Sequence, residues 1–285
     1  MEGGDPLVDF EGQLLTYLDR PVLMIHAHPD DEVFAGGALA AWISSLGGTV
    51  VLHIASAGEA ALSSDHSYRE ARDLRLQQLA VSCSELGIAD WRLFNKGNGW
   101  TDTGGVPKEN SLSSVYPSVL TEEVVGAIRL VRPSLIITVG LDGLTNHPDH
   151  ILIRTAVDQA VGGVQEDLQC QVLGARLRRK HLLSAIQRLE KLILEPVGTG
   201  RVLGVGDETD LLEICAPVTT SSHRKAALDA YSKGLGSTDL ETLLKTYHRR
   251  GDTLLLRAAL DVSGWNNEYF EPLVDGSRGS SIDRS

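Results

Sequence analysis

The sequence predicts an α/β fold, a Rossmann-like three-layer sandwich built around a mostly parallel sheet. Short apolar runs, typical of strands buried on both faces, alternate along the chain with longer segments whose apolar residues have helical spacing. Alternating strands and helices favour right-handed crossovers, which produce parallel sheets. Dense polar motifs directly follow two of the apolar runs, at the edge where such sheets carry their functional sites.

The predicted elements follow one another regularly up to about residue 165. Buried strands are expected at 21–27, 49–55 and 135–140, and a short strand at 91–94. The helices between them are expected at 36–46, 67–86, 121–131 and 151–161. Glycine closes the first two helices and Arg132-Pro133 closes the third, as helix-stop signals do. A Gly/Asn/Ser/Pro-rich loop fills 95–118, and loops of that length in compact domains are usually functional or disordered.

The C-terminal half has a less regular pattern. It offers a basic helical segment at 174–194, an apolar run at 211–218, and helices near 223–234 and 239–248. We expect a single catalytic domain over residues 1–275, less regular from residue 170, and a disordered tail at 276–285. A chain of 285 residues buries a sufficient core without a structural metal, so metal-binding residues indicate function.

The first polar motif is His28-Pro29-Asp30-Asp31-Glu32, directly after the strand at 21–27. Imidazole and carboxylate together suit Zn²⁺ or a similar divalent ion. His28 and Asp31 are three residues apart, so a tight turn can direct both at one ion. Of the two adjacent acids, one is then free to take a proton from water. An alternative is that the acids only cap a helix beside a surface histidine.

The second motif, Asn146-His147-Pro148-Asp149-His150, follows the strand at 135–140. One of its histidines can complete a three-ligand site, and the other can act as an acid or stabilise an oxyanion. Three protein ligands and one open position are typical of catalytic zinc. The alternative reading is a polar helix N-terminus. The pairing of two such motifs at equivalent sheet positions is the strongest functional signal in the chain.

The motif Ala27 to Glu32, followed about 120 residues later by His147 to His150, resembles the PIG-L/LmbE-like family of zinc-dependent de-N-acetylases. The segment Gly99 to Gly104 is similar to the loop G-x-x-D-S-G of mycothiol-pathway members. The resemblance covers residues 20–160 well. The chain departs from the family pattern at Gln78, at Asn146 and at Tyr231 to Lys233, which concerns the substrate pocket more than the metal.

The resemblance implies a role for each matching residue. His28, Asp31 and His150 would bind zinc, Asp30 would be the general base, and His147 would stabilise the oxyanion or protonate the leaving amine. Arg75 and Asp102 would hold sugar hydroxyls. Independently of the family, the aromatic face of Trp100 could stack on a sugar, or Trp100 could pack within its loop. Glu32 is expected beside the ligands rather than among them.

The implied function is a zinc-dependent deacetylase that removes an N-acetyl group from an N-acetylglucosamine conjugate and releases acetate and an amine. Candidate substrates are a sugar-thiol pathway intermediate and a glycosylated metabolite. Alternatives are an amidase that cleaves a larger amide such as a thiol S-conjugate, a non-haem Fe(II) oxygenase with two histidines and one carboxylate, and a non-catalytic binding protein. The sequence does not determine whether the bound ion is Zn²⁺ or Fe²⁺. It does not determine the oligomeric state either.

Composition restricts the partners. There are 26 Lys+Arg and 38 Asp+Glu, so the net charge is −12, which disfavours nucleic-acid binding. Three cysteines without CxxC spacing argue against a disulfide framework and a thiolate zinc site. With no apolar run of membrane-spanning length and no signal-peptide pattern, we expect a cytoplasmic protein that binds a small sugar conjugate and no membrane.

Overall fold

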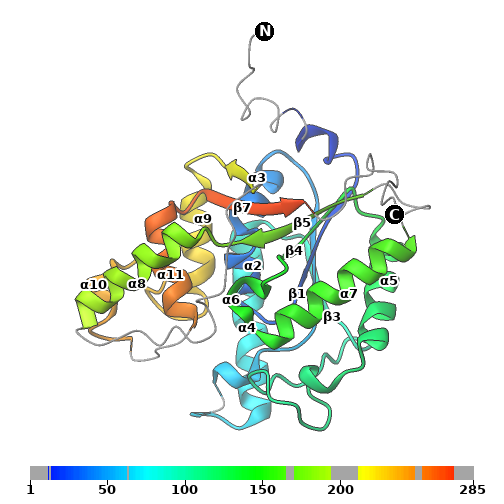
Figure 1. Ribbon diagram of the computed structural model, residues 1–285, viewed down its shortest axis with the longest axis horizontal. Coiled ribbons are helices and arrows are strands. Elements are labelled where there is room, and N and C mark those ends of the chain that lie inside the picture. Colours follow the sequence, from blue (N-terminus) through cyan, green and yellow to red (C-terminus); the bar gives the residue numbers. More distant parts are fainter. Residues whose placement is uncertain are drawn as a thin grey trace, which may run out of the picture.

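The computed structural model describes residues 12, 14–62, 64–164, 170–193, 211–247 and 252–272. Within them, seven strands form one sheet in the order β3-β2-β1-β4-β5-β7-β6 (Figure 1). The strands are β1 (Val22–His26), β2 (Val50–Ile54), β3 (Asp90–Leu93), β4 (Leu135–Val139), β5 (Gln171–Arg176), β6 (Leu212–Cys215) and β7 (Asn267–Pro272). The first five pair in parallel, and β7 is antiparallel to both of its neighbours.

The α-helices connect and cover these strands. They are α2 (Asp31–Phe34), α3 (Gly37–Ser45), α4 (Tyr68–Leu86), α5 (Pro117–Val131), α6 (Gly143–Asn146), α7 (Pro148–Val164), α8 (Arg179–Ile193), α9 (Thr220–Asp229), α10 (Leu240–Leu243) and α11 (Asp252–Ser263). Two short 3₁₀ turns lie at η1 (Glu59–Ala61) and η2 (Leu112–Ser114).

The core has two parts, one on each face of the sheet. Val22 and Met24 of β1 pack into one cluster with α3, α4, α9 and the α8–α11 pair. Leu23 and Ile25, which point the opposite way, pack into the other cluster with α5 and α7. In Figure 1, α5 and α7 lie together on one side of the strands. The predicted three-layer α/β fold is confirmed.

The strand order places a switch point beside β1. From β1 the chain builds outward to β2 and β3 on one side, and to β4 and β5 on the other. The connections that leave β1 and β4 therefore diverge, and a crevice forms at the carboxyl ends of these two strands. The two polar motifs begin at those ends.

The sequence-based prediction was wrong in the C-terminal half. The segment predicted as one helix over 174–194 contains the end of β5, and α8 begins only at Arg179. Val172 to Ala175 are buried between β4 and β7, so sheet pairing determines their conformation. The sequence analysis also missed α11 and β7. The predicted tail at 276–285 lies outside the described residues.

Two helices begin earlier than predicted, and both begin with proline. The helix expected at 121–131 starts at Pro117, and the helix expected at 151–161 starts at Pro148. Proline is tolerated in the first helical turn because the N–H that it lacks would have no partner there. In the described part of the chain, no helix has the length and apolar character needed to cross a membrane.

Two glycine substitutions test this packing with opposite signs. Gly36 precedes α3 with φ +114°, and an added Cβ would lie 2.6 Å from Cγ2 of Ile137. We expect Gly36→Ala to lower the free energy of unfolding by more than about 1–2 kcal/mol, since backbone strain and overlap add. Gly126 lies in α5, and nothing lies within 4 Å of an added Cβ. Gly126→Ala should therefore raise the free energy of unfolding by about 0.5–1 kcal/mol. Denaturant titration measures both, and equal effects would contradict the packing described.

Candidate active site

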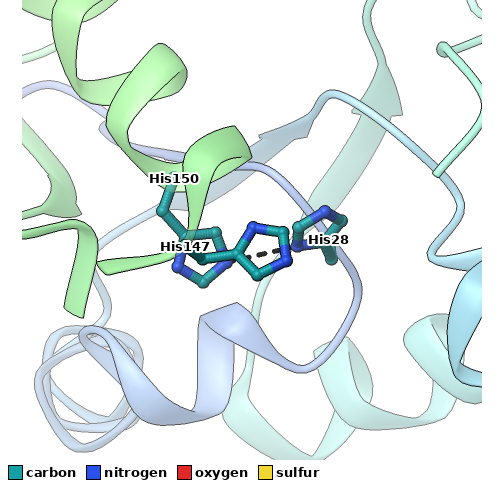
Figure 2. Close-up of side chains that lie close together, drawn as sticks. All are labelled: His28, His147 and His150. Carbon is teal, nitrogen blue, oxygen red and sulfur yellow. Dashed lines mark hydrogen bonds between the residues drawn. The ribbon is translucent and has the colours of Figure 1, made fainter. Parts of the chain in front are cut away.

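The two polar motifs meet at the carboxyl edge of the sheet. His28, Asp30 and Asp31 follow β1 and enter α2, whereas His147 and His150 lie at the start of α7, after β4. The imidazoles of His28, His147 and His150 face one another in Figure 2. The His147 ring centroid lies 5.0 Å from that of His28 and 4.8 Å from that of His150. The structure thus brings together residues 122 positions apart.

The distances among His28, Asp31 and His150 fit a shared metal ion. His28 Nδ1 lies 3.2 Å from His150 Nε2, and His150 Nε2 lies 3.1 Å from Asp31 Oδ1. His28 Nδ1 lies 3.8 Å from Asp31 Oδ2. Tetrahedral ligands about 2.0–2.1 Å from zinc are separated from one another by roughly 3.3 Å. Asp31 uses a different oxygen toward each imidazole, Oδ1 toward His150 and Oδ2 toward His28, at distances close to this spacing.

Neighbouring groups orient each of these ligands. His150 Nδ1 donates to the Gly143 carbonyl at 2.8 Å, and a carbonyl only accepts, so the lone pair of the neutral ring is on Nε2. His28 Nε2 lies 3.2 Å from the Asp149 carboxylate, which leaves the lone pair of a neutral His28 on Nδ1. Asp31 Oδ2 accepts the N–H groups of Ala27 and His28 at 3.1 and 2.9 Å. His28 Nδ1 and Asp31 Oδ1 consequently both lie within 3.2 Å of His150 Nε2.

The charge balance of the site also favours a bound cation. Burial lowers the pKa of His28, but the carboxylates of Asp102, Asp149 and Asp31 outweigh it and raise the pKa to about 10. His150 and His28 hold the pKa of Asp31 below its usual range despite its burial. The protonated imidazole therefore supplies a positive charge that the carboxylates require, and a divalent ion can supply it instead.

Two groups of possible metal ligands meet at His28, and Asp31 belongs to neither. His28, His147 and His150 form one, and His28, Asp102 and Asp149 form the other, with ligand atoms within 4.8 Å in each. Asp102 and Asp149 approach Nε2 of His28, on the opposite side of the ring from Nδ1, which faces His150. His28 Nδ1, His150 Nε2 and the Asp31 carboxylate form a separate candidate set. His147 lies beside it.

Asp30 is held beside these ligands in an unusual backbone conformation. Its φ is +89°, a left-handed value that non-glycine residues adopt at a cost. Its N–H donates to Glu32 Oε2 at 2.9 Å, and its carboxylate pairs with Arg75 at 3.2 Å. Burial raises the pKa of Asp30, whereas Arg75 opposes that rise. The carboxylate lines a cavity of about 340 Å³, where it can accept a proton.

Glu32 lies behind Asp30 and holds that turn. Its carboxylate accepts from Ser82 Oγ and Tyr231 Oη, both at 2.6 Å, and burial raises its pKa to about 7. Tyr231 also lies under the Arg75 guanidinium, 4.6 Å from the ring centroid. The sequence identified Tyr231 only as a departure from the family pattern, and its contacts with both residues were missed.

The expected substrate-binding residues separate into two groups. Arg75 and Asp102 line the cavity together with the metal-site residues. Trp100 does not line it: this side chain is 9% exposed and packs in the core with Ala55 and Leu112. The structure adds Asp252, Thr253 and Leu256 of α11 to the cavity wall, and α11 was not predicted from the sequence.

Asp149 is a site residue that the sequence analysis interpreted only as a helix-dipole partner. Its side chain is fully buried and accepts from Ser113 Oγ at 2.7 Å as well as contacting His28. Ser113 and Asp102 belong to the long loop after β3, so this loop folds against the site. A carboxylate next to a candidate ligand histidine in the His-Pro-Asp-His segment was a usable signal, since ligand histidines commonly donate to carboxylates.

Removing the Asp149 charge should weaken metal binding without removing a ligand. We expect Asp149→Asn to reduce divalent-metal affinity by about 10–100-fold, because the amide holds the His28 ring less firmly in the required tautomer. Chelator competition measures the dissociation constant. Asp73→Asn, which removes one charge from an exposed position on α4, is the matched control. Equal affinities in both variants would rule out this role.

Comparisons with known proteins agree with the site. Residues 23–161 match the family described as GlcNAc-PI de-N-acetylase (PIG-L). A protein of Acidothermus cellulolyticus named 1D-myo-inositol 2-acetamido-2-deoxy-alpha-D-glucopyranoside deacetylase is 30% identical over 60% of this chain and 62% of its own length. A protein of the same name from Thermomonospora curvata is 27% identical over 93% of each chain.

Solved structures share the fold at low sequence identity. The A40926 pseudoaglycone deacetylase is 16% identical with a TM-score of 0.60 over 90% of this chain and 97% of its own. The N,N'-diacetylchitobiose deacetylase of Pyrococcus horikoshii is 14% identical with a TM-score of 0.58 over 95% of this chain and 94% of its own. A 4-carboxy-2-hydroxymuconate hydratase of Pseudomonas putida also aligns, at 13% identity and a TM-score of 0.57, over 93% of this chain and 100% of its own.

The likeness to deacetylases and to a hydratase shows a shared fold and does not by itself determine a reaction. The family match and the named relatives rest on sequence similarity and not on the shared fold. The matched residues 23–161 include both motifs that meet at the site. Residues 23–161, about half of the chain, therefore carry a PIG-L domain.

Proposed function

We propose that this chain is a divalent-metal-dependent deacetylase that removes the acetyl group from an N-acetylglucosamine conjugate and releases acetate and a free amine. The observation that carries the proposal is the meeting of His28, Asp31 and His150 beside one cavity that Asp30 and His147 also line. The names of the relatives support a substrate with a polyol such as inositol attached to the sugar.

Amide hydrolysis requires an activated carbonyl, a nucleophile and a protonated leaving group. A bound Zn²⁺ or Fe²⁺ ion would polarise the carbonyl and lower the pKa of a water molecule, and His28, Asp31 and His150 would hold it. The donor set of two imidazoles and one carboxylate suits either ion, and we propose zinc. The remaining steps belong to the side chains around these ligands.

Asp30 is the proposed general base. It lies next in sequence to the ligand Asp31 but directs its carboxylate to Arg75 and the cavity. Burial favours its protonated form, which makes it a better proton acceptor than an exposed aspartate, and Arg75 keeps the ionised form available. Asp30 accepts the proton of the attacking water and can later give it to the departing nitrogen.

His147 is the proposed donor to the oxygen that gains negative charge. The Asp149 N–H lies 3.3 Å from His147 Nδ1 and donates to it, so the neutral ring carries its proton on Nε2. Burial and the neighbouring His28 and His150 lower the pKa of His147 to about 4, which favours that neutral ring. A neutral imidazole donates a hydrogen bond to the oxyanion without first having to lose or gain a proton.

The sugar hydroxyls are proposed to bind Arg75 and Asp102. Asp102 is fixed by the N–H groups of Gly104 and Ala60, at 2.8 and 3.3 Å, and a carboxylate retains further acceptor positions for hydroxyls. Asp252 and Thr253 of α11 are placed to contact the group attached to the sugar. Trp100 is left out of this proposal because it packs in the core. A cytoplasmic location stays a prediction from the sequence.

The direct test is a substrate panel with the metal-loaded protein. It contains N-acetylglucosaminyl-inositol, other N-acetylglucosaminides, and matched amides with larger acyl groups, and released acetate or acid is measured. Acetate from the N-acetylglucosaminides, lost on chelation and restored by metal, is the expected result. Preference for the larger acyl groups would identify an amidase instead, and no hydrolysis of any member would reject the proposal.

Asp30→Asn should separate proton transfer from metal binding. We expect kcat to fall by about 10²–10⁴-fold because the isosteric amide cannot accept a proton. Metal content should stay near one ion per chain, since Asp30 is not a proposed ligand. Asp73→Asn is again the matched control. A variant that hydrolyses the substrate as fast as wild type would show that Asp30 is not the base.

His147→Ala tests the oxyanion donor. Loss of one such donor costs about 10²–10³-fold in kcat, and KM should change much less because the oxygen is charged only in the transition state. His223→Ala, at an exposed histidine of α9, controls for loss of an imidazole. The assignment would be wrong if His147→Ala raised KM and left kcat as it is in wild type.

A further inference from the structure

The Gly143 carbonyl that orients His150 belongs to a tight turn between β4 and α7. Gly143 has φ +58° and Leu144 has φ +63°, and the second value is costly for a residue with a side chain. Asp142 stabilises the turn from inside: its Oδ1 accepts the Leu144 N–H at 2.9 Å and its carbonyl accepts the Asn146 N–H at 2.8 Å. The orientation of His150 therefore depends on a strained turn that neighbouring groups must hold in place.

Those neighbours come from β5 and β7, outside the matched PIG-L residues 23–161. Arg176 of β5 places its Nε 2.9 Å from Asp142 Oδ2, an ion pair whose angle falls outside hydrogen-bond geometry. Arg176 also pairs with Glu271 of β7. Glu271 accepts the Leu141 N–H at 2.7 Å, so the same carboxylate fixes the start of the turn.

The same cluster also reaches the helix that carries His150. Glu271 pairs with Arg154, which lies one helical turn after His150 on α7 and bonds Asp158 through Nε at 3.0 Å. The side chains of Arg154, Arg176, Asp142 and Glu271 are no more than 15% exposed. Pairs this well buried keep a defined geometry, and removal of one partner leaves an uncompensated charge.

Close packing leaves little freedom for this arrangement to relax. A Cβ at Gly140 would lie 2.1 Å from Cδ of Arg176, so the strand end and the Arg176 stem are in direct contact. A Cβ at Gly143 would lie 3.1 Å from Cβ of His150. Arg176 and His150 therefore both pack directly against the backbone of this segment.

We infer that Arg176 and Glu271 are positioning residues for the metal site: through Asp142 and the Gly143 carbonyl they hold His150 in the tautomer and orientation that bind the ion. The inference rests on the proposed metal centre, and it does not depend on which substrate is hydrolysed. It assigns to β5 and β7 a part in the site that the matched domain alone does not contain.

The test compares two buried arginines. Arg176→Met keeps most of the side-chain volume and removes the charge, and Arg176→Lys restores a charge. Arg257→Met is the matched control, because Arg257 is 2% exposed, pairs with Asp261 and bonds the carbonyls of Leu235 and Thr238, none of which lines the cavity. For each variant, chelator competition gives the divalent-metal dissociation constant, and denaturant titration gives the stability.

We expect Arg176→Met to weaken metal binding by about 10–100-fold and Arg176→Lys to recover part of that loss. Arg257→Met should lower stability with metal affinity within about twofold of wild type. Glu271→Gln, an isosteric change, should also weaken metal binding. It provides the test if Arg176→Met does not fold. If Arg176→Met and Glu271→Gln bind metal as tightly as Arg257→Met does, the cluster is only structural and the inference is overturned.

Metal affinity is measured without substrate, so the result separates this inference from the proposed function. Normal metal binding in wild type with no deacetylase activity would reject the function and leave the positioning role testable. A wild-type protein that binds no divalent ion would reject the metal centre, and the positioning role with it.

Discussion

The parallel pairing of β1 with β4 is the constraint on which the site depends. The two strands are neighbours in register, from Val22 beside Leu135 to Met24 beside Ile137, and so their carboxyl ends share one edge of the sheet. The chain order reverses between them, which leaves room for side chains from both connections. His28 and Asp31 enter from one strand and His150 from the other. Their separation in sequence becomes a separation of 3.1–3.8 Å between donor atoms.

The second constraint is electrostatic. The buried side chains of Asp31, Asp102 and Asp149 surround His28, and carboxylates in such surroundings are costly unless a cation balances them. An imidazolium or a divalent ion can provide that charge, so folding, protonation and metal binding are coupled at this point. Asp30 differs from these three because Arg75 balances it separately. One centre therefore contains carboxylates with different tasks, determined by the cation that each one faces.

Much of this arrangement could be predicted from local sequence patterns. The strands at β1, β2 and β4 are short apolar runs, and the His-Pro-Asp motifs come after β1 and β4, so both the sheet edge and the residues that meet there could be inferred. Asp149 could have been assigned from its place beside the histidines of the second motif, but Arg176 and Glu271 could not, because their ion pairs join segments that are distant in sequence. In the sequence, the segment around Arg176 has the pattern of a basic helix. In the structure, Arg176 ends a strand that pairs with β7. For Trp100 the sequence left sugar stacking and packing both open, and the structure packs this side chain in the core.

We propose that two imidazoles and one carboxylate share a single divalent ion. X-ray absorption spectroscopy of the zinc-loaded protein measures this most directly, because it reports the number, type and distance of the ligands. The account predicts one ion per chain with nitrogen and oxygen ligands only, at about 2.0–2.1 Å, and outer-sphere scattering from two imidazoles that falls to one in His150→Ala. Sulfur ligands at about 2.3 Å, or a spectrum that His150→Ala does not change, would contradict it.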